Sequence, residues 1–159
     1  MKRVTGIILL FVLALQVNAQ QLGQPAPEIS LKNAAGETVT LSSLKGKVVL
    51  LDFWASWCGP CRAGNKELVK LYKKYKAKGF EIYSVSVDSD TDDWKKAIKK
   101  DKITWTQVND PGDWSSATAQ SWGISALPTT FILDKKGTLT DYDLEGRSLE
   151  KKIVELLAK

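Results

Sequence analysis

The 159-residue sequence contains no histidine and only two cysteines, Cys58 and Cys61. Without histidine, the chain cannot form a Ser-His or Cys-His catalytic pair, a His-ligated metal site or a histidine-based pH switch. Two cysteines without histidine are also too few for a zinc site of the usual nitrogen and sulfur ligands. A disulfide across so short a loop would remove little entropy from the unfolded chain. The alternatives of a metal site and of an inert staple are therefore disfavoured, and reactive cysteines are expected.

The sequence has neither a strong net charge nor a long apolar run. Its formal charge is +5, and lysine and arginine are spread along the predicted helices rather than clustered. Such spacing is typical of a solvated surface, so no nucleic-acid partner is expected. The longest apolar stretch, near the N-terminus, is shorter than the roughly 20 residues that a membrane-spanning helix needs.

The first residues have the pattern of an export signal. Lys2 and Arg3 are followed by an apolar segment, Gly6–Leu15, and by the small-residue ending Val17-Asn18-Ala19. This order predicts a secretory signal peptide over residues 1–19 that is cleaved after its last residue. The alternative is an uncleaved anchor that tethers the protein to the inner membrane. In either case the expected location is periplasmic, where disulfides form and persist.

The two cysteines stand where a predicted strand gives way to a predicted helix. The run 48–53 is apolar and β-branched, and a helical pattern begins at Gly59, after Cys58. A cysteine at a helix N-terminus meets unpaired backbone N–H groups and the positive end of the helix dipole, which favour the thiolate. We therefore expect Cys58 to be an exposed nucleophile of lowered pKa and Cys61 to be the resolving thiol.

The remaining pattern predicts a single α/β domain with a mixed sheet, over residues 20–159. Four tryptophans in or beside residues 88–123 are expected to pack in the core or a lid; they are Trp94, Trp105, Trp114 and Trp122. Alternation, apolar spacing and turn residues predict strands at 28–32, 38–41, 48–53, 80–87, 104–108, 129–134 and 138–144, and helices at 59–78, 94–100, 115–122 and from Ser148.

The segment Phe53-Trp54-Ala55-Ser56-Trp57-Cys58-Gly59-Pro60-Cys61 resembles the active site of thioredoxin. Asp52 lies six residues before the first cysteine, and Leu127-Pro128-Thr129 resembles the loop that carries the cis-proline of that family. Gly137 and Gly146 match its hairpin and last-strand glycines. The resemblance implies a thioredoxin-like three-layer sandwich, in which helices flank a central mixed β-sheet.

Two additions resemble the TlpA/ResA-type exported thiol–disulfide oxidoreductases of bacterial envelopes. They are an N-terminal β-hairpin and an insertion, residues 88–123, between the central βαβ unit and the cis-proline strand. The resemblance implies that Cys58 and Cys61 reduce disulfides of partner proteins in the cell envelope. It also implies an upstream membrane thiol donor that regenerates the dithiol, no cofactor and a monomeric protein.

Other activities stay open at this point. An oxidase or isomerase uses the same exchange chemistry, although Gly59-Pro60 resembles reducing thioredoxins. A reductase of cytochrome c maturation is a further alternative, but Gly64 and Lys66 stand where many of those relatives carry Glu and Pro. A peroxiredoxin-type peroxidase would need Thr or Ser in place of Ala55, and a copper-carrying Sco-type module would need a histidine.

Asp52 is the proposed general base. Burial in an apolar strand raises the pKa of a carboxyl, and a carboxylate that titrates near neutrality can take the proton of Cys61. In thioredoxin a lysine on the next strand lies beside this aspartate, and the resemblance places Ser84 there instead. The alternative is an aspartate that tilts to the surface at the strand end.

The predicted substrate groove surrounds the first cysteine. Trp57, Gly59 and Pro60 are expected to form the rim of a shallow apolar groove. Leu127 and Pro128 complete it, because a cis bond at Pro128 would expose the Leu127 backbone to an extended substrate. The alternative is a trans proline that only begins a strand.

Overall fold

A computed structural model describes residues 22–159 of the chain. The predicted signal peptide and its cleavage site lie outside these residues. The elements of the described chain are β1 (Ser30–Asn33), β2 (Thr38–Thr40), η1 (Leu41–Leu44), β3 (Val48–Trp54), α1 (Gly59–Tyr75), η2 (Lys76–Lys78), β4 (Phe80–Ser86), α2 (Thr91–Lys100), β5 (Thr106–Asn109), η3 (Asp113–Ser115), α3 (Ala117–Ser121), β6 (Thr129–Leu133), β7 (Leu139–Tyr142) and α4 (Gly146–Leu157).

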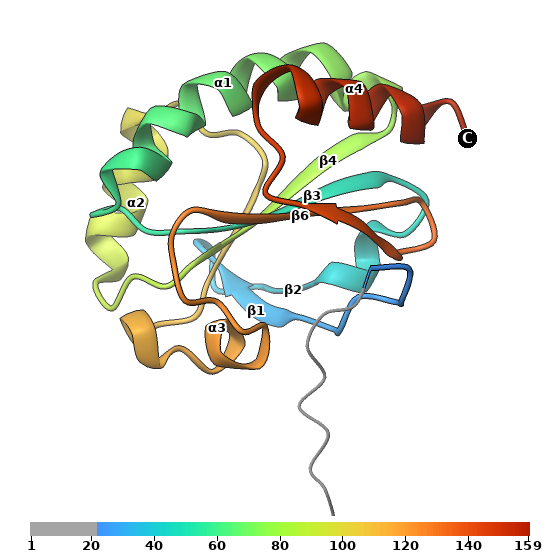
Figure 1. The fold of residues 1–159 in the computed structure, drawn as a ribbon. Coiled ribbons are helices and arrows are strands. Elements are labelled where there is room, and N and C mark those ends of the chain that lie inside the picture. Colours follow the sequence, from blue (N-terminus) through green and yellow to red (C-terminus); the bar gives the residue numbers. More distant parts are fainter. Residues whose placement is uncertain (1–21) are drawn as a thin grey trace, which may run out of the picture.

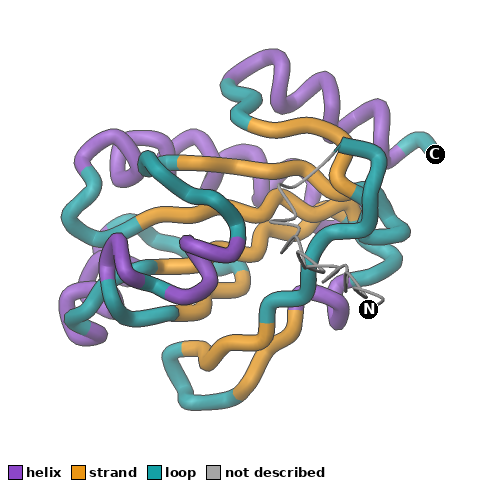
Figure 2. The backbone as a smooth tube through the Cα atoms, turned by 60° about the horizontal axis from the view of Figure 1, so that its bottom comes forward, coloured by secondary structure: helices purple, strands orange, loops and turns teal. Residues whose placement is uncertain are grey.

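The strands form one seven-stranded mixed sheet in the order β2-β1-β5-β4-β3-β6-β7. The central strands β3, β4 and β5 are parallel, whereas β6 and β7 on one side and β1 and β2 on the other run antiparallel to their neighbours. Figure 2 shows the strands side by side through the molecule, with helices on both sides. The predicted mixed sheet and the predicted N-terminal hairpin are confirmed.

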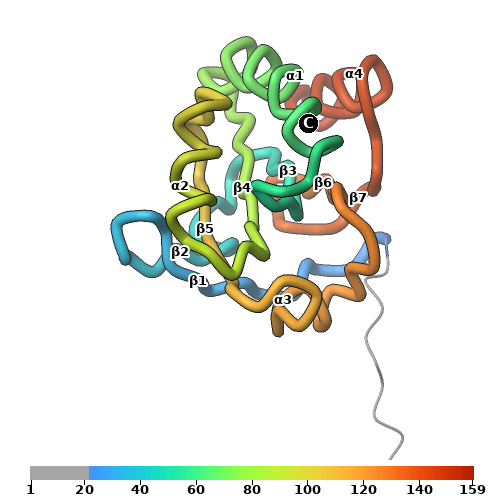
Figure 3. The backbone as a smooth tube through the Cα atoms, turned by 90° about the vertical axis from the view of Figure 1, so that its left-hand side faces the viewer, coloured from blue at the N-terminus to red at the C-terminus, as the bar shows by residue number. Residues whose placement is uncertain are grey.

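Two apolar clusters fill the space on the two faces of the sheet. One joins the sheet to α1, α2 and α4, and the other joins it to η1, to Trp122 and to the start of the described chain. Figures 1 and 3 show α1 and α4 together on one face and α3 on the opposite face. The three layers of the predicted sandwich are therefore helices, sheet and helices, and the fold prediction is confirmed.

Strand β3 is the centre of this arrangement, since β4 and β6 flank it and all seven of its residues are buried. Side chains of a strand alternate between the two faces. Val48 and Leu50 therefore contact the α1 side, and Val49 and Leu51 the opposite side. A strand that is buried on both faces explains the continuous apolar run in the sequence.

Three predicted boundaries in the C-terminal half are wrong. The helix expected at 115–122 is divided, because Ser116 leaves the helical conformation and caps α3 by accepting a hydrogen bond from the N–H of Ala119 (3.2 Å). Strand β7 ends at Tyr142, because Asp143 has a positive φ of 49° and accepts a hydrogen bond from the N–H of Thr130 (2.9 Å). Helix α4 begins at Gly146, not at Ser148, so this glycine belongs to a helix start and not to a strand.

The prediction for the four tryptophans is confirmed for three of them. Trp94, Trp105 and Trp122 are buried in the two core clusters, whereas Trp114 is 51% exposed. Trp114 lies in η3, which follows β5 and contains no buried residue. No helix within residues 22–159 is both long and apolar enough to cross a membrane.

Replacing a glycine by alanine is expected to have opposite effects on stability at Gly64, within α1, and at Gly79, which ends η2 after α1. Gly79 ends η2 with a φ of +96°, so Gly79→Ala should lower the free energy of unfolding by about 1 kcal/mol. Gly64 lies in α1 with open space around it, so Gly64→Ala should raise that free energy by about 0.5–1 kcal/mol. Urea denaturation of both variants measures the two values. Shifts of the same sign would contradict the assignment of the helix end.

Candidate active site

Cys58 and Cys61 form a disulfide at the junction of β3 and α1. Cys58 is the N-cap residue of α1, and its sulfur accepts a hydrogen bond from the backbone N–H of Cys61 (3.2 Å). A donor aimed at this sulfur, together with the positive end of the helix, stabilises a thiolate when the bond is reduced. The local geometry therefore provides the chemistry that the sequence predicts for a nucleophilic cysteine.

The expected exposure of Cys58 is wrong for the disulfide form. Cys58 is 5% exposed and Cys61 is 4% exposed, because both belong to the core cluster under α1. The residues around the bond are the exposed ones, namely Trp57, Gly59 and Pro60. The sulfurs thus lie just below a surface that these three residues form, as the predicted groove requires.

Asp88 anchors the loop that precedes the disulfide. Its carboxylate accepts hydrogen bonds from the backbone N–H of Ser56 (2.9 and 3.1 Å) and from the hydroxyl of Ser56 (2.6 Å). The hydroxyl of Ser86 donates a further bond (2.7 Å), and Asp88 is only 2% exposed. This carboxylate ties the end of β4 to the residue two positions before Cys58. The sequence analysis named position 88 only as the first residue of the insertion.

Arg62 anchors the same loop from the other side. Its guanidinium donates to the backbone carbonyl of Ser56 (3.0 Å) and makes a two-point ion pair with Asp101 at the end of α2. Asn65 donates a further hydrogen bond to Asp101 (3.0 Å). Burial alone would raise the pKa of Asp101, but the bonds from Arg62 and Asn65 hold it below its ordinary value. The sequence analysis missed this pair, because 39 residues separate its members.

Asp52 lies in the core rather than at the surface. It is 3% exposed and pairs in register with Ser84 of β4, whose hydroxyl donates a hydrogen bond to it (2.8 Å). The indole N–H of Trp105 donates in turn to the Ser84 hydroxyl (2.8 Å). The predicted position of Ser84 is confirmed, and the alternative of a surface aspartate is wrong.

Burial raises the pKa of Asp52 to about 6, and the hydrogen bond from Ser84 opposes the rise. Alternation along β3 places Asp52 on the face that also carries Val48 and Leu50, which is the face covered by α1. Helix α1 contains Cys61. A carboxyl that titrates near neutrality thus lies under the helix that contains the resolving cysteine, and its role as a base stays a prediction.

The Leu127-Pro128 loop lies at the same end of the sheet as the disulfide. Thr129, the first residue of β6, pairs with Phe53 near the end of β3, and the antiparallel strands bring the preceding loop to that end. The peptide bond between Leu127 and Pro128 is cis, so the trans alternative is wrong. Leu127 and Pro128 are both partly buried. The substrate contacts predicted for this loop stay a prediction.

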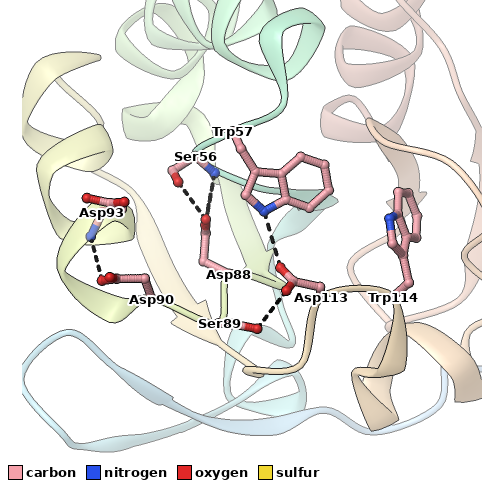
Figure 4. Close-up of a pocket in the computed structure, with 8 residues that line it drawn as sticks. All are labelled: Ser56, Trp57, Asp88, Ser89, Asp90, Asp93, Asp113 and Trp114. Carbon is pink, nitrogen blue, oxygen red and sulfur yellow. Dashed lines mark hydrogen bonds between the residues drawn. The ribbon is translucent and has the colours of Figure 1, made fainter.

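A cleft of about 510 Å³ is lined in part by Ser56 and Trp57, the two residues before Cys58 (Figure 4). Its aromatic members are Trp57 and Trp114, whose ring centroids are 5.9 Å apart. The carboxylate of Asp113 accepts a hydrogen bond from the indole N–H of Trp57 (3.2 Å). The full lining consists of Ser56, Trp57, Asp88, Ser89, Asp90, Asp93, Asp113 and Trp114. The sequence analysis missed this cleft, because three distant segments form it.

Residues 22–159 contain no group of three or more cysteine, aspartate or glutamate side chains that could hold a metal ion.

Known proteins resemble this chain over most of its length. The model of the AhpC/TSA family matches residues 22–142. The thiol-disulfide oxidoreductase ResA of Bacillus thuringiensis subsp. konkukian is 30% identical over 139 residues, which is 87% of this chain and 78% of that protein. The solved thiol-disulfide oxidoreductase of Bacteroides fragilis is 40% identical, with a TM-score of 0.78, and the match covers 84% of this chain and 99% of that one.

The solved thioredoxin domain of a thiol-disulfide oxidoreductase from Bacteroides vulgatus is 36% identical, with a TM-score of 0.80. That match covers 86% of this chain and 98% of the domain. Together the comparisons confirm the thioredoxin-like fold and the resemblance to ResA-type proteins.

The raised pKa of Asp52 predicts a pH-dependent stability. Between the ordinary value of 3.8 and about 6, the folded protein holds a proton that the unfolded chain has released. Stability from this group is therefore lost as the pH rises through that range, by about 3 kcal/mol in all. Asp52→Asn removes this titration. The free energy of unfolding of the variant minus that of the parent should therefore be greater at pH 7.5 than at pH 4, by roughly this amount.

Urea denaturation of the oxidised proteins at both pH values measures the difference. Ser84→Ala is the matched variant, because it keeps the carboxyl but removes the hydrogen bond that lowers its pKa. It should enlarge the loss of stability with rising pH. A stability difference between Asp52→Asn and the parent that is the same at both pH values would contradict the account.

Proposed function

Since this chain belongs to the AhpC/TSA family and is a thiol–disulfide oxidoreductase, we propose that it reduces disulfides of partner proteins in the cell envelope. The observation that carries the proposal is the position of Cys58, whose sulfur caps α1 and accepts the N–H of Cys61. That position favours the thiolate that begins the exchange. The Gly59-Pro60 pair between the cysteines, which resembles reducing thioredoxins, supports the reducing direction.

The reaction begins with attack of the Cys58 thiolate on one sulfur of the partner disulfide. The partner's S–S bond breaks, its second sulfur leaves as a thiolate, and a mixed disulfide joins Cys58 to the partner. The Cys61 sulfur then attacks Cys58 and loses its proton to Asp52, while the bond between Cys58 and the partner breaks. The partner's first sulfur leaves as a thiolate, which takes a proton from solvent. Two electrons pass from the protein dithiol to the partner, and the Cys58–Cys61 disulfide remains.

Burial suits Asp52 to the second step of this reaction. At a pH above about 6 it is a carboxylate in an apolar surrounding, so it accepts a proton more readily than a surface aspartate does. The hydrogen bond from Ser84 holds the carboxylate in one orientation. An upstream membrane thiol donor then returns two electrons to the disulfide and completes the cycle.

The proposed location rests on the first 19 residues, which have the sequence pattern of a secretory signal. Export would bring the domain to an oxidising compartment. The surroundings there oxidise thiols to disulfides, so a reductase in that compartment needs electrons from a membrane donor. Cleavage after Ala19 would release the domain, and an uncleaved segment would tether it.

The reducing direction predicts a low reduction potential for the Cys58–Cys61 pair. We expect a value near that of thioredoxin, about −270 mV, and far below the roughly −120 mV of the oxidant DsbA. Equilibration with glutathione or dithiothreitol buffers and counting of free thiols measures it. A potential above about −180 mV, in the range of disulfide isomerases, would assign the protein to oxidation or isomerisation instead.

The order of attack predicts that only one cysteine variant retains a partner. Cys61→Ser should leave Cys58 joined to its partner, because no second sulfur resolves the mixed disulfide. Cys58→Ser is the matched control and should retain none, because Cys61 lies inside the first turn of α1. Non-reducing gels of both variants, expressed with the full chain, compare the adducts. Equal trapping by the two variants would contradict the assigned roles.

A further inference from the structure

The cleft beside the disulfide is made by three parts of the chain that the sequence separates. Trp57 comes from the loop before Cys58, Asp90 and Asp93 come from the start of α2, and Asp113 and Trp114 come from η3 in the insertion. The backbone N–H of Asp113 donates to the carbonyl of Val87 (2.8 Å). The hydroxyl of Ser89 donates to the Asp113 carboxylate (2.7 Å), which fixes η3 beside β4. The insertion therefore forms one wall of a groove whose other wall adjoins the reactive sulfur.

Two exposed tryptophans line the cleft. Trp57 and Trp114 are each 51% exposed, and they are neighbours, with ring centroids 5.9 Å apart. Figure 4 shows the Asp113 carboxylate below the indole of Trp57, with Trp114 beside them. Two exposed indoles in contact at the mouth of a reactive site are typical of a surface that binds another molecule.

The cleft is acidic, although the chain carries a net charge of +5. Four of its lining residues are aspartates, and no lysine or arginine lines it. Within the described chain, Asp93 is the only one of the four in an ion pair, with Lys96 one turn further along α2. The other three accept hydrogen bonds from uncharged groups and are in no ion pair among residues 22–159, although Arg62 attracts Asp88 and Lys96 attracts Asp90 at longer range.

This combination fits one kind of side chain. The aliphatic stem of lysine or arginine packs on indole faces, and its charged group is attracted both to the ring and to nearby carboxylates. An acidic segment would be repelled by the aspartates. A purely apolar segment would remove water from them without replacing the lost hydrogen bonds. The cleft is lined by Trp57, the residue before Cys58, so it lies within reach of a polypeptide whose cysteine exchanges with Cys58.

We propose that the cleft between Trp57 and Trp114 binds a lysine- or arginine-containing stretch of the partner protein, next to the cysteine that exchanges with Cys58. The proposal rests on the proposed function and names the chemistry of its partner. It assigns the insertion a role in partner selection. Asp90 and Asp113 provide the attraction, and the two indoles provide the packing surface.

The test compares two synthetic peptides of equal length. Each carries one cysteine that is disulfide-linked to thionitrobenzoate, flanked on both sides by lysine in one peptide and by glutamate in the other. The rate at which the reduced protein releases the coloured thiol is measured with each. Because both peptides carry the same disulfide, the ratio of the two rates measures the effect of the flanking residues. At low salt we expect the lysine peptide to react about tenfold faster.

The informative variant is Asp90→Asn/Asp113→Asn. Asparagine at position 90 still caps α2, and at position 113 its carbonyl still accepts from the indole of Trp57, so mainly charge is lost. The rate ratio should fall to about threefold or less. Asp92→Asn is the matched control, since Asp92 is an exposed residue of the same first turn that does not line the cleft. It should keep most of the ratio.

Three results would overturn the proposal. They are a ratio near one in the parent protein, a ratio that the double variant retains, and an equal fall in Asp92→Asn, which would indicate general surface charge. Reduction of an uncharged small disulfide, hydroxyethyl disulfide, separates these results from a failure of the proposed function. If the parent protein does not reduce even this compound, the reductase assignment fails; if it does so without discriminating between the peptides, only the cleft proposal fails.

Discussion

The hydrogen bond from the N–H of Cys61 to the sulfur of Cys58 is the interaction on which the account of this protein depends. It exists because α1 begins immediately after Cys58, so that a first-turn N–H without a helical partner points at the sulfur. Strand β3, buried on both faces, fixes where the helix begins. Asp88 and Arg62 hold Ser56, two residues before the sulfur, from opposite sides. The fold thus fixes one sulfur next to helix N–H groups and covers it with a thin layer of exposed residues.

The site lowers the stability of the fold at neutral pH. A carboxyl at position 52 with a pKa of about 6 is charged in an apolar core under the conditions in which the enzyme works. A leucine there would pack without that penalty. In the proposed mechanism this carboxyl is the base for Cys61, and it is only 3% exposed to solvent. Ser84 orients it by donating a hydrogen bond, and Trp105 donates to Ser84 in turn, so neither adds a compensating charge.

Local sequence patterns predicted the parts of the molecule that depend on neighbouring residues. The buried strand and the helix after Cys58, with its end before Gly79, follow from apolar runs and backbone preferences. The pairing of Asp52 with Ser84 followed from the resemblance to thioredoxin. The remainder required contacts between distant segments. The Arg62–Asp101 pair, the bond from Asp113 to Trp57 and the exposed position of Trp114 depend on where the insertion packs. The low exposure of Cys58 was missed because a helix-cap position fixes the backbone of a residue and not what covers its side chain.

The ionisation of Cys58 in the reduced protein is the most direct test of the central claim. The rate of its alkylation by iodoacetamide, measured against pH in the folded protein and again in denaturant, gives the pKa of the thiol in both states. The account predicts a folded value of about 7 or below and an ordinary value of about 8.5 in the unfolded chain. A folded value at or above the unfolded one would show that the helix N-terminus does not stabilise the thiolate, and it would contradict the account.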